Sequence, residues 1–210
     1  MATLAEQARR LNWRGAENGR RGAQHGARGG IALITDRERM PDPLPLLDRL
    51  PPGGLVVLRH YGAPDRAALA AVLARACRAR RLELVVAEDF DLAIRLSAGL
   101  HLPEGLARSG AARVRLWHRR TGKTLTAAAH SRMALVRAAA LGADLAFLSP
   151  VFATVSHPGA PALGAVRFRA LARGARLPVW ALGGMTKESV RRLGGSKAAG
   201  VGAVGGLSRD

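Results

Sequence analysis

Eight short apolar segments, most of them separated by stretches with helical spacing, constrain the fold of this 210-residue chain more than any other feature. A short apolar run between turn residues is typical of a strand buried on both faces. Strands that alternate with helices indicate a parallel sheet whose outside is covered by those helices. The expected strands span residues 31–35, 55–59, 82–87, 99–102, 124–129, 145–150, 178–182 and 200–204.

Helical patterns lie between most of these segments. Ser131 and Thr186 are suitable N-caps, and Gly142 stands where a C-cap is expected. Because the stretch 103–123 shows the weakest pattern, we expect only a short fourth helix there. The chain is therefore predicted to form a single (β/α)8 TIM barrel over residues 31–210; a flavodoxin-like open sheet is the alternative, which the count of eight disfavours. The expected helices span residues 43–50, 64–80, 89–98, 131–141, 165–172 and 186–193.

Residues 1–30 hold Gly, Arg, Asn and Gln with little periodicity after Leu11, and they are predicted to be a flexible basic extension with space for one short helix at 3–11. The net charge of +18 comes almost wholly from arginine, since only three lysines occur, and aromatic residues are only 4% of the chain. Arginines that are spread through the predicted helices, without aromatic residues for base stacking, argue against a nucleic-acid partner.

No apolar run reaches the length of a membrane span, and the N-terminus lacks the apolar block of a secretion signal. We therefore expect a cytoplasmic protein without a membrane partner. The single cysteine, Cys77, falls in the helical pattern of 64–80 and is interpreted as a helix residue near the core. A homo-oligomer stays possible, because so many alanines blur the apolar helix faces.

Two glycine pairs follow the last two expected strands. Gly183 and Gly184 end the seventh, and Gly205 and Gly206 end the eighth. Without a Cβ, backbone N–H groups can approach an anion closely, and a barrel holds a phosphate after its last two strands in this way. Alone, either pair could equally be a helix cap or a turn.

Polar side chains gather where the expected strands end, which is the active-site face of such a barrel. Four of the six histidines are among them. Histidine exchanges protons near neutral pH, although a single histidine at a strand end is more often structural. A zinc cluster is disfavoured, because no two histidines have a short ligand spacing. The strand-end residues are Thr35, Asp36, Arg59, His60, Tyr61, Glu88, Asp89, His101, His130, Ser131, Thr154, Ser156 and His157.

In order and spacing, a series of short motifs from Ile31 to Leu207 resembles the thiamine phosphate synthase family, which includes the TenI-type thiazole tautomerases. The motifs are Leu33-Ile34-Thr35-Asp36, Val57-Leu58-Arg59, Asp91-Leu92-Ala93, Gly99-Leu100-His101-Leu102, Ala129-His130-Ser131, Gly142-Ala143-Asp144, Ser149-Pro150-Val151-Phe152-Ala153-Thr154, Leu163-Gly164 and Ala181-Leu182-Gly183-Gly184-Met185.

The resemblance implies a transferase of thiamine biosynthesis that joins a thiazole phosphate to a pyrimidine pyrophosphate and releases pyrophosphate. It places the thiazole phosphate on Gly183 and Gly184 and on the segment from Gly205 and Gly206. Arg59 matches a family arginine, and Thr154, Ser156 and His157 stand where the family has a Thr-x-Thr-Lys loop.

The resemblance also implies Mg²⁺ on the leaving pyrophosphate, whose charge a metal and fixed cations neutralise. Here the family's pattern is altered. Ala87 and Glu88 stand in place of an Asn-Asp pair, Leu106 lies near the second metal aspartate with Glu104 the closest acid, and Ala128 replaces a serine. Glu88 is thus the single candidate metal ligand.

A tautomerase of the TenI type needs a phosphate site and one acid or base, and the resemblance assigns that role to His130. The alternative functions are therefore such a tautomerase and a noncatalytic phosphate-binding or regulatory protein.

Overall fold

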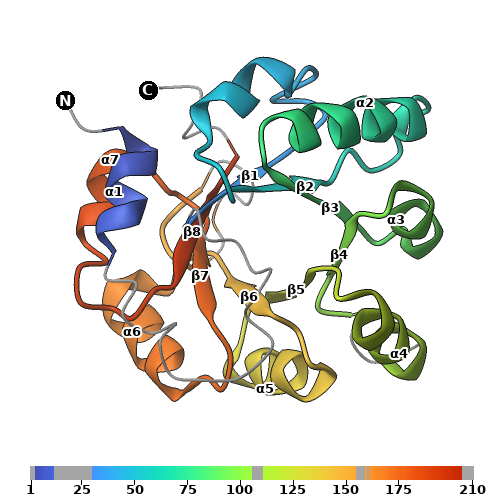
Figure 1. Cartoon of the computed structure of the whole chain (residues 1–210). Coiled ribbons are helices and arrows are strands. Elements are labelled where there is room, and N and C mark those ends of the chain that lie inside the picture. The colour runs from blue at the N-terminus through green and yellow to red at the C-terminus, as the bar shows by residue number, and fades with distance from the viewer. Residues whose placement is uncertain (1–2, 12–29, 106–110, 155–158, 160, 205–210) are drawn as a thin grey trace.

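The structure is a computed structural model, which describes residues 3–11, 30–105, 111–154, 159 and 161–204. Eight parallel strands form a closed barrel in which each strand pairs with its neighbours in the chain and β1 pairs with β8 (Figure 1). Each segment expected to be a strand contains one, so the predicted (β/α)8 fold is confirmed and the open sheet is excluded. The strands are β1 (Ile31–Ile34), β2 (Leu55–Leu58), β3 (Glu83–Ala87), β4 (Gly99–Leu102), β5 (Leu125–Ala129), β6 (Leu145–Leu148), β7 (Val179–Leu182) and β8 (Gly200–Ala203).

Helices cover the outside of the barrel (Figure 1). Two differ from expectation. The segment after β1 is a 3-10 helix, and α4 has 11 residues where a short helix was expected. The sequence pattern of α4 is weak because Val114 is its only buried residue and five of its eleven residues are arginine or histidine. The helical elements are α1 (Leu4–Arg10), η1 (Leu44–Arg49), α2 (Arg66–Ala79), α3 (Phe90–Leu96), α4 (Ala111–Thr121), α5 (Arg132–Leu141), α6 (Gly164–Gly174) and α7 (Lys187–Arg191).

Two large aromatic side chains fill one side of the barrel interior. Phe147 of β6 and Trp180 of β7 are buried and meet edge to face, with ring centroids 5.8 Å apart. The neighbouring strand β8 has glycine opposite them: a Cβ on Gly200 would lie 2.5 Å from the Trp180 ring, and one on Gly202 would lie 3.2 Å from Phe147. Glycine in β8 is therefore required by the space that the aromatic rings occupy.

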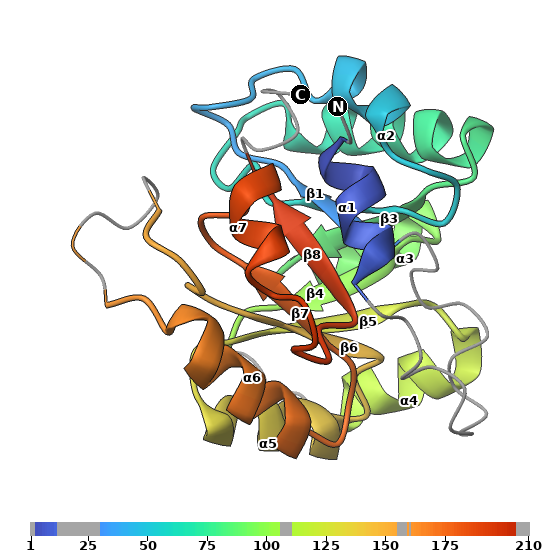
Figure 2. The same cartoon turned by 90° about the vertical axis from the view of Figure 1, so that its left-hand side faces the viewer.

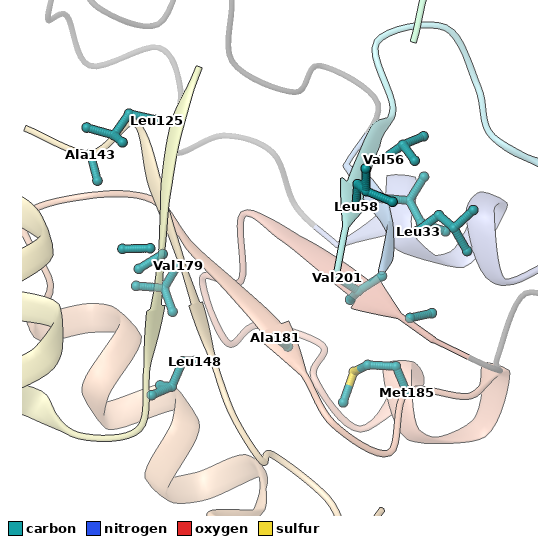
Figure 3. Close-up of a cluster of buried hydrophobic side chains, with 14 of the residues drawn as sticks. Leu33, Val56, Leu58, Leu125, Ala143, Leu148, Val179, Ala181, Met185 and Val201 are labelled. Atoms are coloured by element: carbon teal, nitrogen blue, oxygen red, sulfur yellow. The ribbon is translucent and has the colours of Figure 1, made fainter. Parts of the chain in front are cut away.

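The main core lies between the strands and the helices. Figure 3 shows part of it, where Leu33, Val56 and Leu58 of β1 and β2 point away from the barrel axis into the helical layer. Cys77 belongs to this core: it is almost fully buried on α2, and burial raises the pKa of its thiol to about 12. A thiol with so high a pKa is a packing residue and not a nucleophile.

The N-terminal helix α1 is part of the folded barrel. It lies beside α7 and against β1 and β8 (Figure 2), with Leu4 fully buried and Ala8 nearly so. A capping box between Thr3 and Glu6 begins the helix. The structure thus differs from the expectation of a flexible extension over 1–30: the short helix that the pattern allowed at 3–11 is docked, and the folded part of the chain begins before Ile31. Residues 12–29 lie outside the described residues.

Truncation of Leu4 tests this docking. Leu4→Ala removes a buried side chain and leaves a cavity, so the free energy of unfolding should fall by roughly 2–5 kcal/mol. Urea unfolding measures the change. The matched control is Leu116→Ala on α4, where the leucine side chain is half exposed and the loss should stay below about 1 kcal/mol. Equal losses in the two variants would contradict a docked α1.

Candidate functional site

The turn after β7 contains the first glycine pair. Gly183 has φ +90° and Gly184 has φ +66°, and Thr186 then caps α7 through a reciprocal pair of hydrogen bonds with Ser189. A Cβ on Gly183 would lie 2.9 Å from Pro150 Cα, and one on Gly184 would lie 2.5 Å from the Ala153 carbonyl oxygen. These glycines are therefore required by the loop after β6, which packs against them. The β6 loop thus occupies the space that the Cβ atoms would need, and an anion at the N–H groups of this pair stays a prediction.

The backbone of the same turn still offers hydrogen-bond donors. Gly183 accepts a hydrogen bond from Phe152 N–H (3.1 Å), but no described residue accepts one from the N–H of Gly183 or Gly184. Both glycines are half-buried. Because α7 has only five residues and the capping box uses the N–H groups of Thr186 and Ser189, any anion binding here rests on the turn itself more than on a helix dipole.

A second group of side chains lies at the ends of β2 and β3. The guanidinium groups of Arg59 and Arg66 lie 5.5 and 5.9 Å from the ring centroid of Tyr61. Burial raises the pKa of Tyr61, and the charge of Glu88 adds to this rise while the two arginines oppose it. Arg66 is paired with Asp89 (3.3 Å) and donates to the Ala87 carbonyl, whereas Arg59 forms no ion pair with a described residue. Arg59 is thus the cation of this group that is available to an anionic ligand.

Glu88 directly follows β3 and has a left-handed backbone, with φ +65°. Such a conformation is strained for a residue with a side chain and is often found at functional sites. Its carboxylate takes part in none of the ion pairs of the described residues. The neighbouring Asp89 is engaged, since it caps α3 and pairs with Arg66. Within the described residues no three acidic, histidine or cysteine side chains form a group that could hold a metal.

Two buried histidines at the strand ends are held by threonines. Thr35 Oγ1 lies 2.8 Å from His60 Nδ1 and accepts the Arg59 N–H (3.0 Å), while His60 Nε2 faces the Pro41 carbonyl oxygen at 3.4 Å. Both ring nitrogens of His60 therefore face protein atoms. This arrangement supports a structural role for His60 and Thr35, which fix the start of the β2–α2 loop.

His101 lies inside the barrel, where its Nδ1 is 2.8 Å from Thr126 Oγ1 and its ring meets Phe147 edge to face. Burial lowers the pKa of His101 to about 3, and the charge of Arg59 contributes to the shift. A histidine with so low a pKa stays neutral at physiological pH and does not act as an acid there.

His101 also makes stability depend on pH. An unfolded histidine has a pKa of about 6.5, so between about pH 6.5 and pH 3 the unfolded chain binds a proton that the folded chain does not. The contribution of His101 to the free energy of unfolding is complete above about pH 6.5. It is lost as the pH falls, by up to roughly 1.4 kcal/mol per pH unit. Urea unfolding between pH 7.5 and 5 should therefore show a steeper loss for the wild type than for His101→Asn. Equal slopes would contradict the low pKa.

His130 stands at the end of β5 and is held by an acid from another strand end. Its backbone N–H and its ring Nδ1 both lie within hydrogen-bond distance of Glu104 Oε2, at 3.0 and 2.9 Å. Arg137 of α5 donates to the other oxygen of Glu104 at 2.9 Å. Burial would raise the pKa of Glu104, but the hydrogen bonds from His130 and the charges of His130 and Arg137 outweigh it, so the net pKa is lowered.

The structure thus forms two groups from the predicted site residues. Arg59 lies beside Tyr61, whose pKa the charge of Glu88 also raises, and His130 meets Glu104; no hydrogen bond or ion pair among the described residues joins the two groups. Thr154 is half-buried, while Ser156, His157, Gly205 and Gly206 lie outside the described residues. Sequence reasoning missed Arg66 and Arg137, because each lies on a helix whose arginines look alike in the sequence, and it noted Glu104 only as an acid near a metal position.

The described part of the chain contains no helix long and apolar enough to cross a membrane.

Comparison with known proteins agrees with this architecture. The profile of the thiamine monophosphate synthase family matches residues 31–207. The thiamine-phosphate synthase of Anoxybacillus flavithermus is 31% identical over 178 residues, which cover 80% of this chain and 80% of that protein. The thiamine-phosphate synthase of Geobacillus kaustophilus is 30% identical over 183 residues, covering 86% and 73%.

Among solved structures, the thiamine phosphate pyrophosphorylase of Pyrococcus furiosus superimposes with a TM-score of 0.68 at 21% identity and covers 83% of this chain and 85% of its own. A 3-hexulose-6-phosphate synthase, at 14% identity and a TM-score of 0.61, shares the fold. The family match spans all eight strands of the barrel, from β1 through β8. The chain therefore belongs to the thiamine monophosphate synthase family.

Proposed function

We propose that this protein binds a thiazole phosphate at the mouth of the barrel and joins it to a pyrimidine pyrophosphate, as a thiamine phosphate synthase does. Family membership is the observation that carries the proposal. In this reaction the carbon–oxygen bond to pyrophosphate breaks and pyrophosphate leaves with the electron pair, while a carbon–nitrogen bond to the thiazole forms. Negative charge grows on the leaving group, so the site needs fixed positive charge.

Arg59 supplies such a charge. Its guanidinium stands at the β2 end beside Tyr61, and no described acid pairs with it. The N–H groups of Gly183 and Gly184 on the other side of the barrel, which donate to no described residue, are suited to the phosphate of the thiazole. The two anionic groups of the substrates would then occupy different strand ends of one barrel mouth.

The carboxylate of Glu88 is compatible with Mg²⁺, which usually binds one or two carboxylates together with substrate phosphates. Glu88 would hold the ion, which when bound neutralises the charge of the leaving pyrophosphate. Asp89 and Glu104 are held by other side chains, so no second described carboxylate at these strand ends is free to share the ion. We therefore expect Mg²⁺ binding to depend strongly on pyrophosphate.

The test is a turnover assay with both substrates and Mg²⁺, in which mass spectrometry follows thiamine phosphate and a coupled assay follows pyrophosphate. Product above the no-enzyme control supports the proposal, and Arg59→Gln should then reduce it. Arg113→Gln is the control, because Arg113 is an exposed arginine paired with Asp91. Binding of thiazole phosphate without product would contradict the synthase.

The hydrogen bond between His130 and Glu104 favours a second candidate, a thiazole tautomerase. Such an enzyme removes a proton from one atom of the bound thiazole and returns it to another, and a histidine next to a carboxylate is suited to this step. Exchange of solvent deuterium into a thiazole phosphate, measured without pyrimidine substrate or Mg²⁺, separates this reaction from condensation.

A further inference from the structure

We infer that Glu104 is a positioning residue that fixes one tautomer of His130 and leaves His130 Nε2 as the reactive atom. The inference rests on the second proposed function, because it describes how His130 would exchange a proton with a bound thiazole. It begins from the hydrogen bonds of three side chains that come from three different segments: the loop after β4, the end of β5, and α5.

Each oxygen of the Glu104 carboxylate faces a different side chain. Oε2 lies 2.9 Å from His130 Nδ1, and Oε1 accepts a hydrogen bond from Arg137 at 2.9 Å. The lowered pKa of Glu104 keeps it ionised, and an ionised carboxylate only accepts hydrogen bonds. The proton between the two side chains must therefore belong to His130 Nδ1, which leaves the lone pair of a neutral ring on Nε2.

Exposure agrees with this division of roles. The side chain of His130 is 53% exposed, whereas those of Glu104 and Arg137 are 27% and 28% exposed. The acid and the arginine are thus the more covered part of the group, and the histidine ring is the part that a ligand can reach. When Nε2 accepts a proton, the positive imidazolium stays next to the carboxylate, which stabilises it.

The other described histidines lack this arrangement. Nδ1 of His60 and Nδ1 of His101 face threonine hydroxyls, and both rings are buried. His118 Nδ1 faces the Lys123 carbonyl oxygen, and its Nε2 lies near Asp144 at 3.6 Å. Of the four histidines that the structure describes, His130 alone joins an exposed ring to a carboxylate at Nδ1.

A simple structural role for Glu104 would tie the β4 loop to β5 without any effect on the tautomer. The direct test is therefore the tautomer itself, read from the imidazole ¹⁵N chemical shifts of His130 in the full protein above pH 8. We expect the Nδ1–H form in the wild type. In Glu104→Gln, whose amide can donate as well as accept, we expect a mixture with the Nε2–H form.

Arg137→Leu is the companion variant, since it removes the arginine and leaves Glu104 in contact with His130; it should keep more of the Nδ1–H form than Glu104→Gln does. His118→Gln serves as the control and should leave the His130 resonances unchanged. A wild-type His130 in the Nε2–H form, or a Glu104→Gln spectrum identical to that of the wild type, would overturn the inference.

Activity gives a second readout. If the wild type exchanges deuterium into thiazole phosphate, Glu104→Gln should lower kcat at least about tenfold and change KM little, because the ring is misoriented while the phosphate is still bound. An unchanged kcat would overturn the positioning role. If the tautomer is fixed as expected but the wild type exchanges no deuterium, the proposed tautomerase fails while the assignment of the hydrogen bond stands.

Discussion

Replacement of His130 by glutamine is expected to lower the rate of proton exchange at a bound thiazole phosphate by about 10²- to 10⁴-fold, the usual contribution of a general acid or base. Glutamine keeps polarity and approximate size but cannot carry a proton back and forth. The ring of His130 is exposed and oriented by Glu104, so its loss should affect chemistry more than folding. Deuterium incorporation followed by mass spectrometry measures the effect.

His118→Gln is the matched control for this experiment. His118 is also paired with an acid, Asp144, but it contacts the Lys123 carbonyl just before β5 begins, at the end of the barrel opposite to the site. It should leave exchange unchanged. If the two variants exchange deuterium equally fast, His130 is not the acid or base. If only the condensation reaction is seen and His130→Gln leaves it intact, the synthase is favoured over the tautomerase.

Of the single added methyl groups considered in this barrel, the one in Gly184→Ala is expected to lower the free energy of unfolding most. The added Cβ would lie 2.5 Å from the Ala153 carbonyl oxygen and 2.8 Å from Phe152 Cβ, on a backbone with φ +66°. The left-handed backbone costs roughly 1–2 kcal/mol with a side chain, and the overpacking adds about 1–3 kcal/mol. Together these should lower Tm by roughly 5–15 °C for a domain of this size.

Gly195→Ala separates the two contributions. Gly195 has nearly the same φ, +67°, but a Cβ there would meet nothing within 4 Å. Gly195→Ala should therefore lose only the free energy that a left-handed backbone costs in a residue with a side chain. Thermal unfolding followed by circular dichroism gives both values, and equal losses would contradict the close packing of the β6 loop on the β7 turn. Because that turn also carries N–H groups that donate to no described residue, Gly184→Ala should weaken binding of inorganic phosphate or thiazole phosphate as well.

The sequence by itself determined the barrel. Eight apolar segments are enough, because strands buried on both faces require an apolar side chain at nearly every position, and such runs stand out from the helices between them. Their order also sufficed to place Arg59, Glu88 and His130 at the carboxyl ends of strands. Helix α4 was less visible, since it buries one residue only and five of its eleven residues are arginine or histidine.

Only the tertiary structure decided how the site residues are paired. His130 and Glu104 are 26 residues apart, and nothing local in the chain indicates that Glu104 meets both His130 and Arg137. The docking of α1 and the reason for the Gly183–Gly184 pair depend equally on contacts with distant segments, namely α7 and the β6 loop. Periodicity reports which face of an element is buried, but the partner that buries it, and the acid that orients a histidine, are fixed only when the strands close into a barrel.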